Sequence, residues 1–258
     1  MDMPHTFDDL VRVMARLRGP QGCPWDREQT PRSLRPYLLE EAYETLNAIE
    51  RDDDEALCEE LGDILLQVVF HAQMAEEAGR SGIAAVVDGL VRKLVDRHPH
   101  VFGPVPLPNA AAVLAHWEED KRAKRGSLFE GIPEALPALA HAQKVQERAR
   151  ATGFQWPDAT AALAKVRDEL AELEAATASG QPDEVADELG DLFFTLINVA
   201  IFSGVDAEMT VRDATRKFLD RFGRVQTLAD ASGRPLREHT LDELLALWAE
   251  SKTPRKPA

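Results

Sequence analysis

Short acidic motifs recur in two parts of the sequence. Glu-Glu-Ala-Tyr-Glu occupies 40–44 and Glu-Leu-Gly-Asp occupies 60–63, with fifteen residues between them. Asp-Glu-Leu-Ala-Glu at 168–172 and Glu-Leu-Gly-Asp at 188–191 repeat this order with the same spacer. Acids three or four residues apart share one face of a helix, and such all-oxygen ligand sets suit Mg²⁺ or Mn²⁺. The motifs therefore predict divalent-metal chemistry in both parts of the chain.

The acids of these motifs are the predicted metal ligands: Glu40, Glu41, Glu44, Glu60, Asp63, Asp168, Glu169, Glu172, Glu188 and Asp191. An isolated Glu-x-x-Glu pattern is more often a solvated helix face than a metal site. The second motif of each copy favours the interpretation as a metal site. The helix that carries it is apolar on nearly every side, so its acids are expected to be buried. Burying a carboxylate costs on the order of several kcal/mol unless it is paired or binds a metal. No Glu-x-x-His motif occurs, so a di-iron centre is not predicted.

A glycine lies inside the second motif of each copy, at Gly62 and Gly190. A glycine inside a helix costs about 1 kcal/mol relative to alanine. Such a cost is easier to understand where a neighbouring backbone must come close. We therefore expect tight packing beside the acids.

The elements that carry these motifs are predicted to be helices. Apolar residues recur at helical spacing, as at Leu38, Ala42, Leu46 and Ile49, while alternating strand-like segments are hard to find. The repeat has a constant offset, since 169 − 41 and 191 − 63 both equal 128. We expect an all-α fold built from a duplicated helical bundle, with one domain at 1–121, a linker at 122–136 and a second domain at 137–258.

Basic and aromatic residues follow each pair of acidic motifs. The candidates for phosphate binding are Lys93 with Arg97, Lys217 with Arg221, Trp117 with Lys121, and Trp248 with Lys252. Each basic pair lies four residues apart and can grip one phosphate chain from a single helix face. The alternative interpretations are cations that favour a helix C-terminus and tryptophans that serve the core. His98 and His100 are interpreted as capping or packing residues.

Composition excludes several classes of protein. The formal net charge is −15, which disfavours general nucleic-acid binding. Two cysteines without a CxxC motif predict neither a disulfide framework nor a zinc site. The N-terminus shows no signal pattern, and the longest apolar run is too short to span a bilayer. We expect a soluble cytoplasmic protein without membrane partners.

Taken together, these motifs resemble those of the MazG family. Gly-Cys-Pro-Trp-Asp at 22–26, Arg-His-Pro-His-Val-Phe at 97–102 and Gly-Phe-Gln-Trp at 153–156 extend the resemblance over nearly the whole chain. The resemblance implies a helical homodimer in which Mg²⁺ on the carboxylates holds a nucleoside triphosphate. It also implies hydrolysis of the α,β bond to NMP and pyrophosphate, and a role in nucleotide-pool housekeeping.

The family resemblance assigns activity mainly to the C-terminal copy. The matching residues are Lys165, Asp168, Glu169, Glu172, Glu188, Asp191, Lys217, Arg221, Trp248 and Lys252. Glu184 departs from the pattern, because some relatives carry lysine there. The N-terminal copy keeps its acids but has Tyr37 where the second copy has Lys165, so that copy is active, altered in specificity or structural.

One carboxylate, Glu41 or Glu169, is expected to orient or deprotonate the attacking water. Lys217 and Arg221 are expected to neutralise the charge that grows on pyrophosphate. Two alternatives stay open: a non-catalytic interaction protein with acidic surfaces, and a hydrolase of an alarmone-type nucleotide. The preference for base and sugar is not readable from the sequence.

Overall fold

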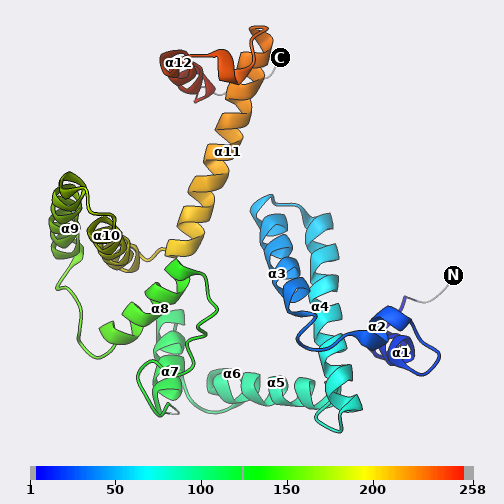
Figure 1. The fold of residues 1–258 in the computed structure, drawn as a ribbon. Helices are drawn as coiled ribbons and strands as arrows, with labels where there is room; N and C mark the ends of the chain where they lie inside the picture. Colours follow the sequence, from blue (N-terminus) through cyan, green and yellow to red (C-terminus); the bar gives the residue numbers. More distant parts are fainter. Residues whose placement is uncertain (1–3, 124, 253–258) are drawn as a thin grey trace. The chain divides into compact units, whose positions relative to one another are not determined.

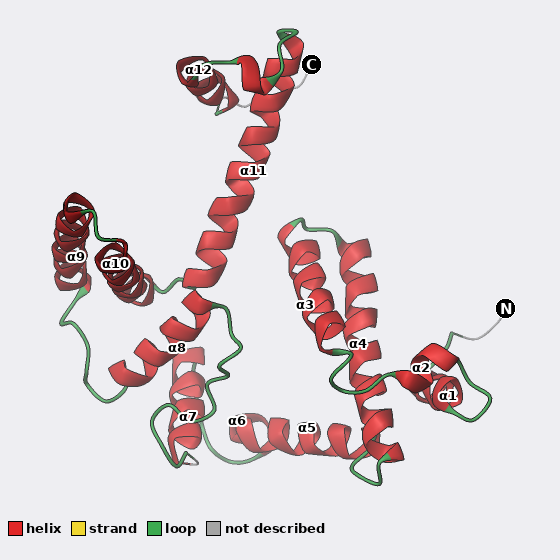
Figure 2. Cartoon of the chain, viewed as in Figure 1, coloured by secondary structure: helices red, strands yellow, loops and turns green. Residues whose placement is uncertain are grey.

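The computed structural model describes residues 4–123 and 125–252, apart from the side chain of Lys121. Within these residues the chain forms twelve α-helices and one short 3₁₀ helix, and it forms no strand (Figure 2). The all-α prediction is confirmed. The chain divides into two compact units, Met1–Glu118 and Glu119–Ala258. The division lies inside helix α7, upstream of the segment 122–136 that the sequence suggested as a linker.

The first unit is built around an antiparallel pair of helices, α3 and α4 (Figure 1). A capping box at Thr6 and Asp9 starts α1, and the Asp53 side chain accepts a hydrogen bond from the Ala56 amide and so starts α4. A small core of Met14, Leu34, Val69, Phe70 and Met74 joins α1 to α4. The helices are α1 (Phe7–Arg18), α2 (Pro24–Glu28), α3 (Arg35–Glu50), α4 (Asp54–Glu77), α5 (Ile83–Arg97), α6 (Pro99–Phe102) and α7 (Ala110–Ala123).

The second unit contains a matching antiparallel pair, α9 and α10. Gly180 ends α9 with a φ of 72°, a left-handed conformation that glycine adopts without strain, and Pro182 then begins α10. Helix α8 packs on α10, and α11 packs on α12. The elements are α8 (Ala138–Arg150), α9 (Ala159–Ser179), α10 (Pro182–Ser203), α11 (Ala207–Ala231), the 3₁₀ helix η1 (Leu236–Glu238) and α12 (Leu241–Ser251).

The acid-bearing helices are more exposed than the sequence suggested. Leu61 on α4 is 53% exposed and Phe193 on α10 is 52% exposed. The expected burial of these helices within the chain is wrong, because α4 is covered mainly by α3 and only in part by α1 and α5, and α10 is covered mainly by α9 and α8. The expected tight packing at Gly62 and Gly190 is also wrong: a Cβ built at either glycine meets no atom within 4 Å. Both apolar helices therefore keep uncovered faces.

In the part of the chain that the structure describes, no single helix has the length and apolar character needed to cross a membrane. The bent pair α10 and α11 passes that test only when both helices are taken together.

Candidate metal centres

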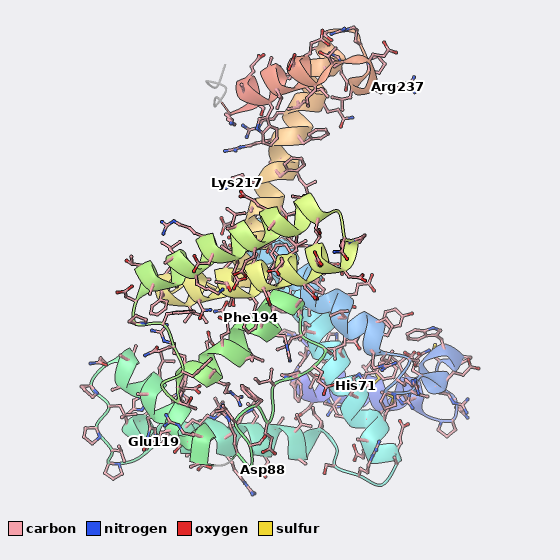
Figure 3. The ribbon with its side chains drawn as sticks, turned by 60° about the vertical axis from the view of Figure 1, so that its left-hand side comes forward. His71, Asp88, Glu119, Phe194, Lys217 and Arg237 are labelled. Carbon is pink, nitrogen blue, oxygen red and sulfur yellow. The ribbon has the colours of Figure 1, made fainter. Side chains whose placement is uncertain are left out.

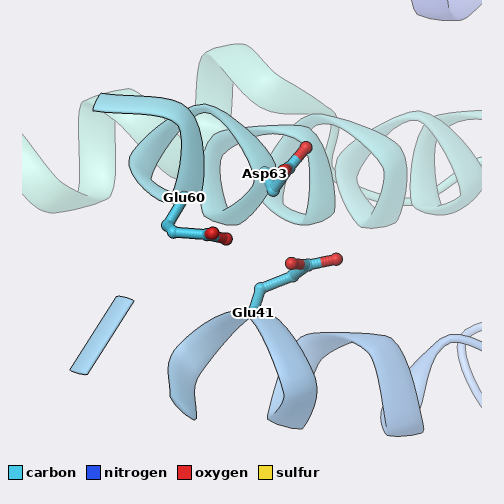
Figure 4. A group of neighbouring side chains, drawn as sticks. All are labelled: Glu41, Glu60 and Asp63. Atoms are coloured by element: carbon cyan, nitrogen blue, oxygen red, sulfur yellow. The ribbon is translucent and has the colours of Figure 1, made fainter. Parts of the chain in front are cut away.

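The first cluster of acids lies between α3 and α4. Glu41 points from α3 toward Glu60 and Asp63 on α4, and one carboxylate oxygen from each residue lies within 4.8 Å of the others (Figure 4). We call these three residues the N-terminal acid group. Partial desolvation raises the pKa of Glu41, and the nearby charge of Asp63 raises it further. Desolvation also raises the pKa of Glu60, followed by repulsion from Glu44. The group thus holds carboxylates that disfavour one another's ionised form.

The second cluster lies between α9 and α10 and contains Glu169, Glu172 and Glu188, whose oxygens also lie within 4.8 Å of one another. We call it the C-terminal acid group. Desolvation raises the pKa of Glu188, and the charges of Glu172 and Asp191 act in the same direction. The two acid groups therefore show the same mutual repulsion between carboxylates.

Glu169 is the most buried acid of this group, with only 5% of its surface exposed. Its Oε1 lies 2.9 Å from Lys165 Nζ, and the same Nζ lies 4.0 Å from Glu172 Oε2. The hydrogen bond to Glu169 raises the pKa of Lys165. The second oxygen, Glu169 Oε2, is buried and has no hydrogen-bond partner. A buried carboxylate oxygen without a partner is costly, and a bound metal ion would be one way to satisfy it.

The remaining predicted ligands lie beside these groups. Glu44 and Asp191 act through their charge on Glu60 and Glu188, respectively, without belonging to either set of three. Glu40 and Asp168 are exposed, one residue before Glu41 and Glu169. The structure thus brings together three carboxylates per copy where the sequence suggested four or more.

The predicted phosphate cations of the second copy gather elsewhere in the same unit. Lys217 lies on α11 (Figure 3). Together with Arg221 on the same helix and Lys252, it lines a pocket of about 300 Å³. The Arg221 guanidinium lies 6.0 Å from the ring centre of Trp248 on α12. No member of the C-terminal acid group lines this pocket. Within one chain, the cations are therefore grouped with one another and not around the acids.

Some of the predicted phosphate-binding residues of the first copy form contacts with neighbouring residues of the same unit. The Trp117 indole N–H donates a hydrogen bond to the backbone carbonyl of Arg97 at 2.6 Å, and its ring packs edge-on against His98 at 5.3 Å. His98 caps the end of α5, as the sequence suggested. Lys93 is exposed on α5, and the Lys121 side chain lies outside the described part of the chain.

A cavity of about 720 Å³ adjoins the C-terminal acid group. Its wall includes Lys165, which also forms the ion pair with Glu169, and the aromatic residues Phe154, Trp156 and Phe194. Gln146 on α8 and Asn198 on α10 add polar groups to the wall. The sequence singled out Lys165 and the motif at 153–156, but it missed Gln146, because nothing in a single sequence marks one glutamine on an amphipathic helix.

Glu184, where the sequence departs from some relatives, has a local structural role. Its carboxylate accepts hydrogen bonds from Ser179 Oγ and Gln181 Nε2, both at 2.8 Å. These contacts order the turn between α9 and α10. Glu184 thus helps to set the approach of the two acid-bearing helices.

Comparisons with known proteins agree with this duplicated, all-helical arrangement. Residues 29–102 match the model of the MazG nucleotide pyrophosphohydrolase domain, and residues 140–218 match that of phosphoribosyl-ATP pyrophosphohydrolase. Over 250 residues the chain is 42% identical to the nucleoside triphosphate pyrophosphohydrolase/pyrophosphatase MazG of Thermotoga maritima, with 95% of each chain covered. It is 41% identical over 254 residues to a nucleoside triphosphate pyrophosphohydrolase of Escherichia coli (strain K12), with 95% of this chain and 97% of the relative covered. The chain belongs to the MazG family.

Proposed function

We propose that the C-terminal unit hydrolyses nucleoside triphosphates to nucleoside monophosphates and pyrophosphate. The observation that carries this proposal is an acid group whose buried member, Glu169, has an unpartnered oxygen, together with an aromatic cavity joined to that group by Lys165. An acid group alone fits many cations. The adjoining cavity supplies room for a base and sugar, and the names of the two relatives point to the same reaction.

The metal that suits this group is Mg²⁺, with Mn²⁺ as a substitute. Glu169, Glu172 and Glu188 would hold it, since they offer only hard oxygen ligands and Glu169 Oε2 lacks any other partner. When bound, the ion would offset the repulsion between the carboxylates and the triphosphate and lower the pKa of a bound water. Relief of the repulsion that raises the pKa of Glu188 is a further reason to expect a cation here.

The acidic and basic side chains have different roles in the proposed reaction. Glu169 Oε2 would face the metal, and Glu169 Oε1 can accept a hydrogen bond from the attacking water once Lys165 turns away from it. Lys165 can turn from Glu169 toward a phosphate, since its side chain is 31% exposed and lies on the cavity wall. Lys217 and Arg221 would stabilise the charge on the departing pyrophosphate.

Because those two cations lie apart from the acids within one chain, we also propose a homodimer. The acid-bearing helices expose Leu189, Phe193 and Leu196, and α11 exposes Phe218, Leu219 and Phe222. Apolar faces of this kind normally need a cover, and a second copy of the chain offers matching faces. In such a dimer, α11 of one copy would bring its cations to the acids of the other. The site would then be incomplete in a single chain.

Mixed dimers test the shared site. Glu172→Gln and Lys217→Ala chains, each inactive alone, are refolded together and compared with the separate proteins. Mixed dimers would regain about a quarter to a half of the activity, because one of their two sites is intact. Light scattering should give twice the mass of the chain. A monomer, or mixed dimers without regained activity, would contradict the shared site.

The reaction itself is tested with purified protein, a panel of NTPs and dNTPs, and Mg²⁺ or EDTA. We expect NMP and pyrophosphate, lost in EDTA, with oxygen from H₂¹⁸O in one of the two products. Glu169→Gln should abolish turnover, whereas Glu174→Gln should not, because Glu174 is an exposed acid of the same helix outside the acid group. NDP with phosphate, or no turnover by the wild type, would refute the proposal.

A further inference from the structure

A buried glutamine on the cavity wall has only half of its hydrogen-bonding capacity satisfied. Gln146 is 7% exposed and lies on α8. Its Nε2 donates a hydrogen bond to the backbone carbonyl of Phe194 on α10 at 2.6 Å. Its Oε1 is buried and has no partner in the described part of the chain. Buried polar atoms without partners are rare, and each one calls for an explanation.

The orientation of this amide is fixed by its neighbour. A backbone carbonyl can only accept hydrogen bonds, so the amide nitrogen has to face Phe194 and the amide oxygen has to face away. Exchanging the two ends would set two oxygens against each other. Gln146 lines the cavity, and the hydrogen-bonding capacity that it has left is that of an acceptor and not of a donor.

The surroundings of Gln146 suit a flat, partly apolar ligand. Phe154, Trp156 and Phe194 line the same cavity, and Phe154 is 82% exposed and so has a free ring face. Aromatic side chains of this kind stack on nucleobases. On α10, Thr195 and Asn198 continue the face of Asp191 into the cavity wall, so the cavity begins about one helical turn from the acids. A base in the cavity leaves its triphosphate close to the acid group.

We propose that Gln146 makes the C-terminal site prefer bases with an exocyclic amino group, adenine and cytosine, over their oxo counterparts, hypoxanthine and uracil. This inference rests on the proposed function, because it names the substrate class of that same site. Adenine N6 and cytosine N4 are donors that project beyond the ring. Hypoxanthine and uracil carry a carbonyl oxygen where adenine and cytosine carry the amino group, and this oxygen repels the Gln146 oxygen. A fixed acceptor therefore favours the amino base.

The test compares substrates that differ only in this group. For the wild-type protein, kcat/KM should be about tenfold or more higher for ATP than for ITP, and for CTP than for UTP, because a missing partner leaves a buried acceptor unpaired. Gln146→Met keeps the size of the side chain and removes the acceptor. It should bring both ratios close to one, mainly by lowering the values for ATP and CTP.

Gln143→Met is the matched control on the same helix. Gln143 Oε1 accepts a hydrogen bond from the Ala207 amide at 2.7 Å, and Gln143 does not line the cavity. Loss of this contact can lower stability, but both substrate ratios should stay at the wild-type value. Circular dichroism of each variant checks that the helices are intact.

The outcomes separate the two proposals. Absence of hydrolysis for every nucleotide refutes the proposed function itself. Hydrolysis with ATP and ITP, and CTP and UTP, used equally well refutes the role of Gln146 while leaving the function intact. Ratios that survive in Gln146→Met also refute it. If that variant does not fold, the wild-type ratios alone decide, because equal use of the paired substrates contradicts a fixed acceptor.

Discussion

The two acid groups share a helical scaffold and differ one turn before their first acid. Tyr37 precedes Glu41 by four residues, and Lys165 precedes Glu169 by four. Tyr37 packs edge-on against Trp25 with ring centres 6.1 Å apart. Lys165 instead forms an ion pair with Glu169 and lines the cavity that Trp156 also helps to line. One substitution thus gives an aromatic contact in one copy and a charged cavity wall in the other.

This difference should affect metal binding and phosphate binding in different ways in the two copies. In the described part of the chain, no basic side chain pairs with the N-terminal acid group, so its three carboxylates keep their full mutual repulsion. That group should attract a divalent ion at least as strongly as the C-terminal group. The C-terminal group gives up some of this attraction to Lys165 and gains a cation that can contact a phosphate. We therefore expect both copies to bind metal and the C-terminal copy to perform the hydrolysis.

The largest effect should come from removing equivalent acids from the two copies. Glu172→Gln should lower kcat for NTP hydrolysis by more than about a hundredfold, since even outer partners of a metal ligand cost roughly 10- to 100-fold when removed. Glu44→Gln, its counterpart 128 residues earlier, should keep most of the activity. Steady-state kinetics on the full chain measure both. Equal losses in the two variants would show that both copies turn over substrate.

The next effect concerns the residue that distinguishes the copies. Lys165→Met removes the ion pair with Glu169 and a cation on the cavity wall, and should lower kcat/KM by about 10- to 100-fold. It should also destabilise the metal-free protein by about 1–3 kcal/mol, because Glu169 then lies buried without any partner.

The reciprocal variant is Tyr37→Lys, which places a cation beside Glu41. It should weaken metal binding to the N-terminal group without adding hydrolytic activity. Isothermal titration with Mn²⁺ measures the binding. If Tyr37→Lys raised NTP hydrolysis severalfold, the position would be sufficient to make this copy active, and the loss of Lys at 37 would be the whole difference between the copies.

Metal binding should also stabilise both units. A ligand at about 100 times its Kd adds roughly 2.7 kcal/mol to the free energy of unfolding, which raises Tm by several degrees for units of this size. Glu41→Gln and Glu169→Gln should each remove part of the rise that Mg²⁺ produces, the former from the first unit and the latter from the second. Calorimetry with and without Mg²⁺ measures this. A rise lost entirely in one variant would assign metal binding to one copy.

The sequence allowed the all-α fold, the duplication and the main acids to be predicted, because helical periodicity and repeated charges are local patterns. It failed where the outcome depends on distant partners. The apolar residues Leu61 and Phe193 suggested burial, yet they are 53% and 52% exposed, respectively. Gln146 could not be found, because its importance comes from a contact with Phe194, 48 residues away. The separation of Lys217 from the acids is likewise a property of packing and not of spacing.

The smallest effect compares the first helix of one unit with the last helix of the other. Thr6 with Asp9 and Thr240 with Glu243 form matching capping boxes. The hydrogen bonds from Thr6 lower the pKa of Asp9 to about 2, and a hydrogen bond from Arg234, followed by that from the Thr240 backbone, lowers the pKa of Glu243 to about 2. Because both pKa values lie below those of the unfolded chain, the caps stabilise above pH 4.5 and lose their effect as the pH falls toward 2. Asp9→Asn and Glu243→Gln should each make the stability of their helix depend less on pH in this acidic range. Amide exchange of α1 and α12 between pH 5 and pH 3 measures it helix by helix. Equal effects of the two substitutions would show that the two caps respond to acid alike.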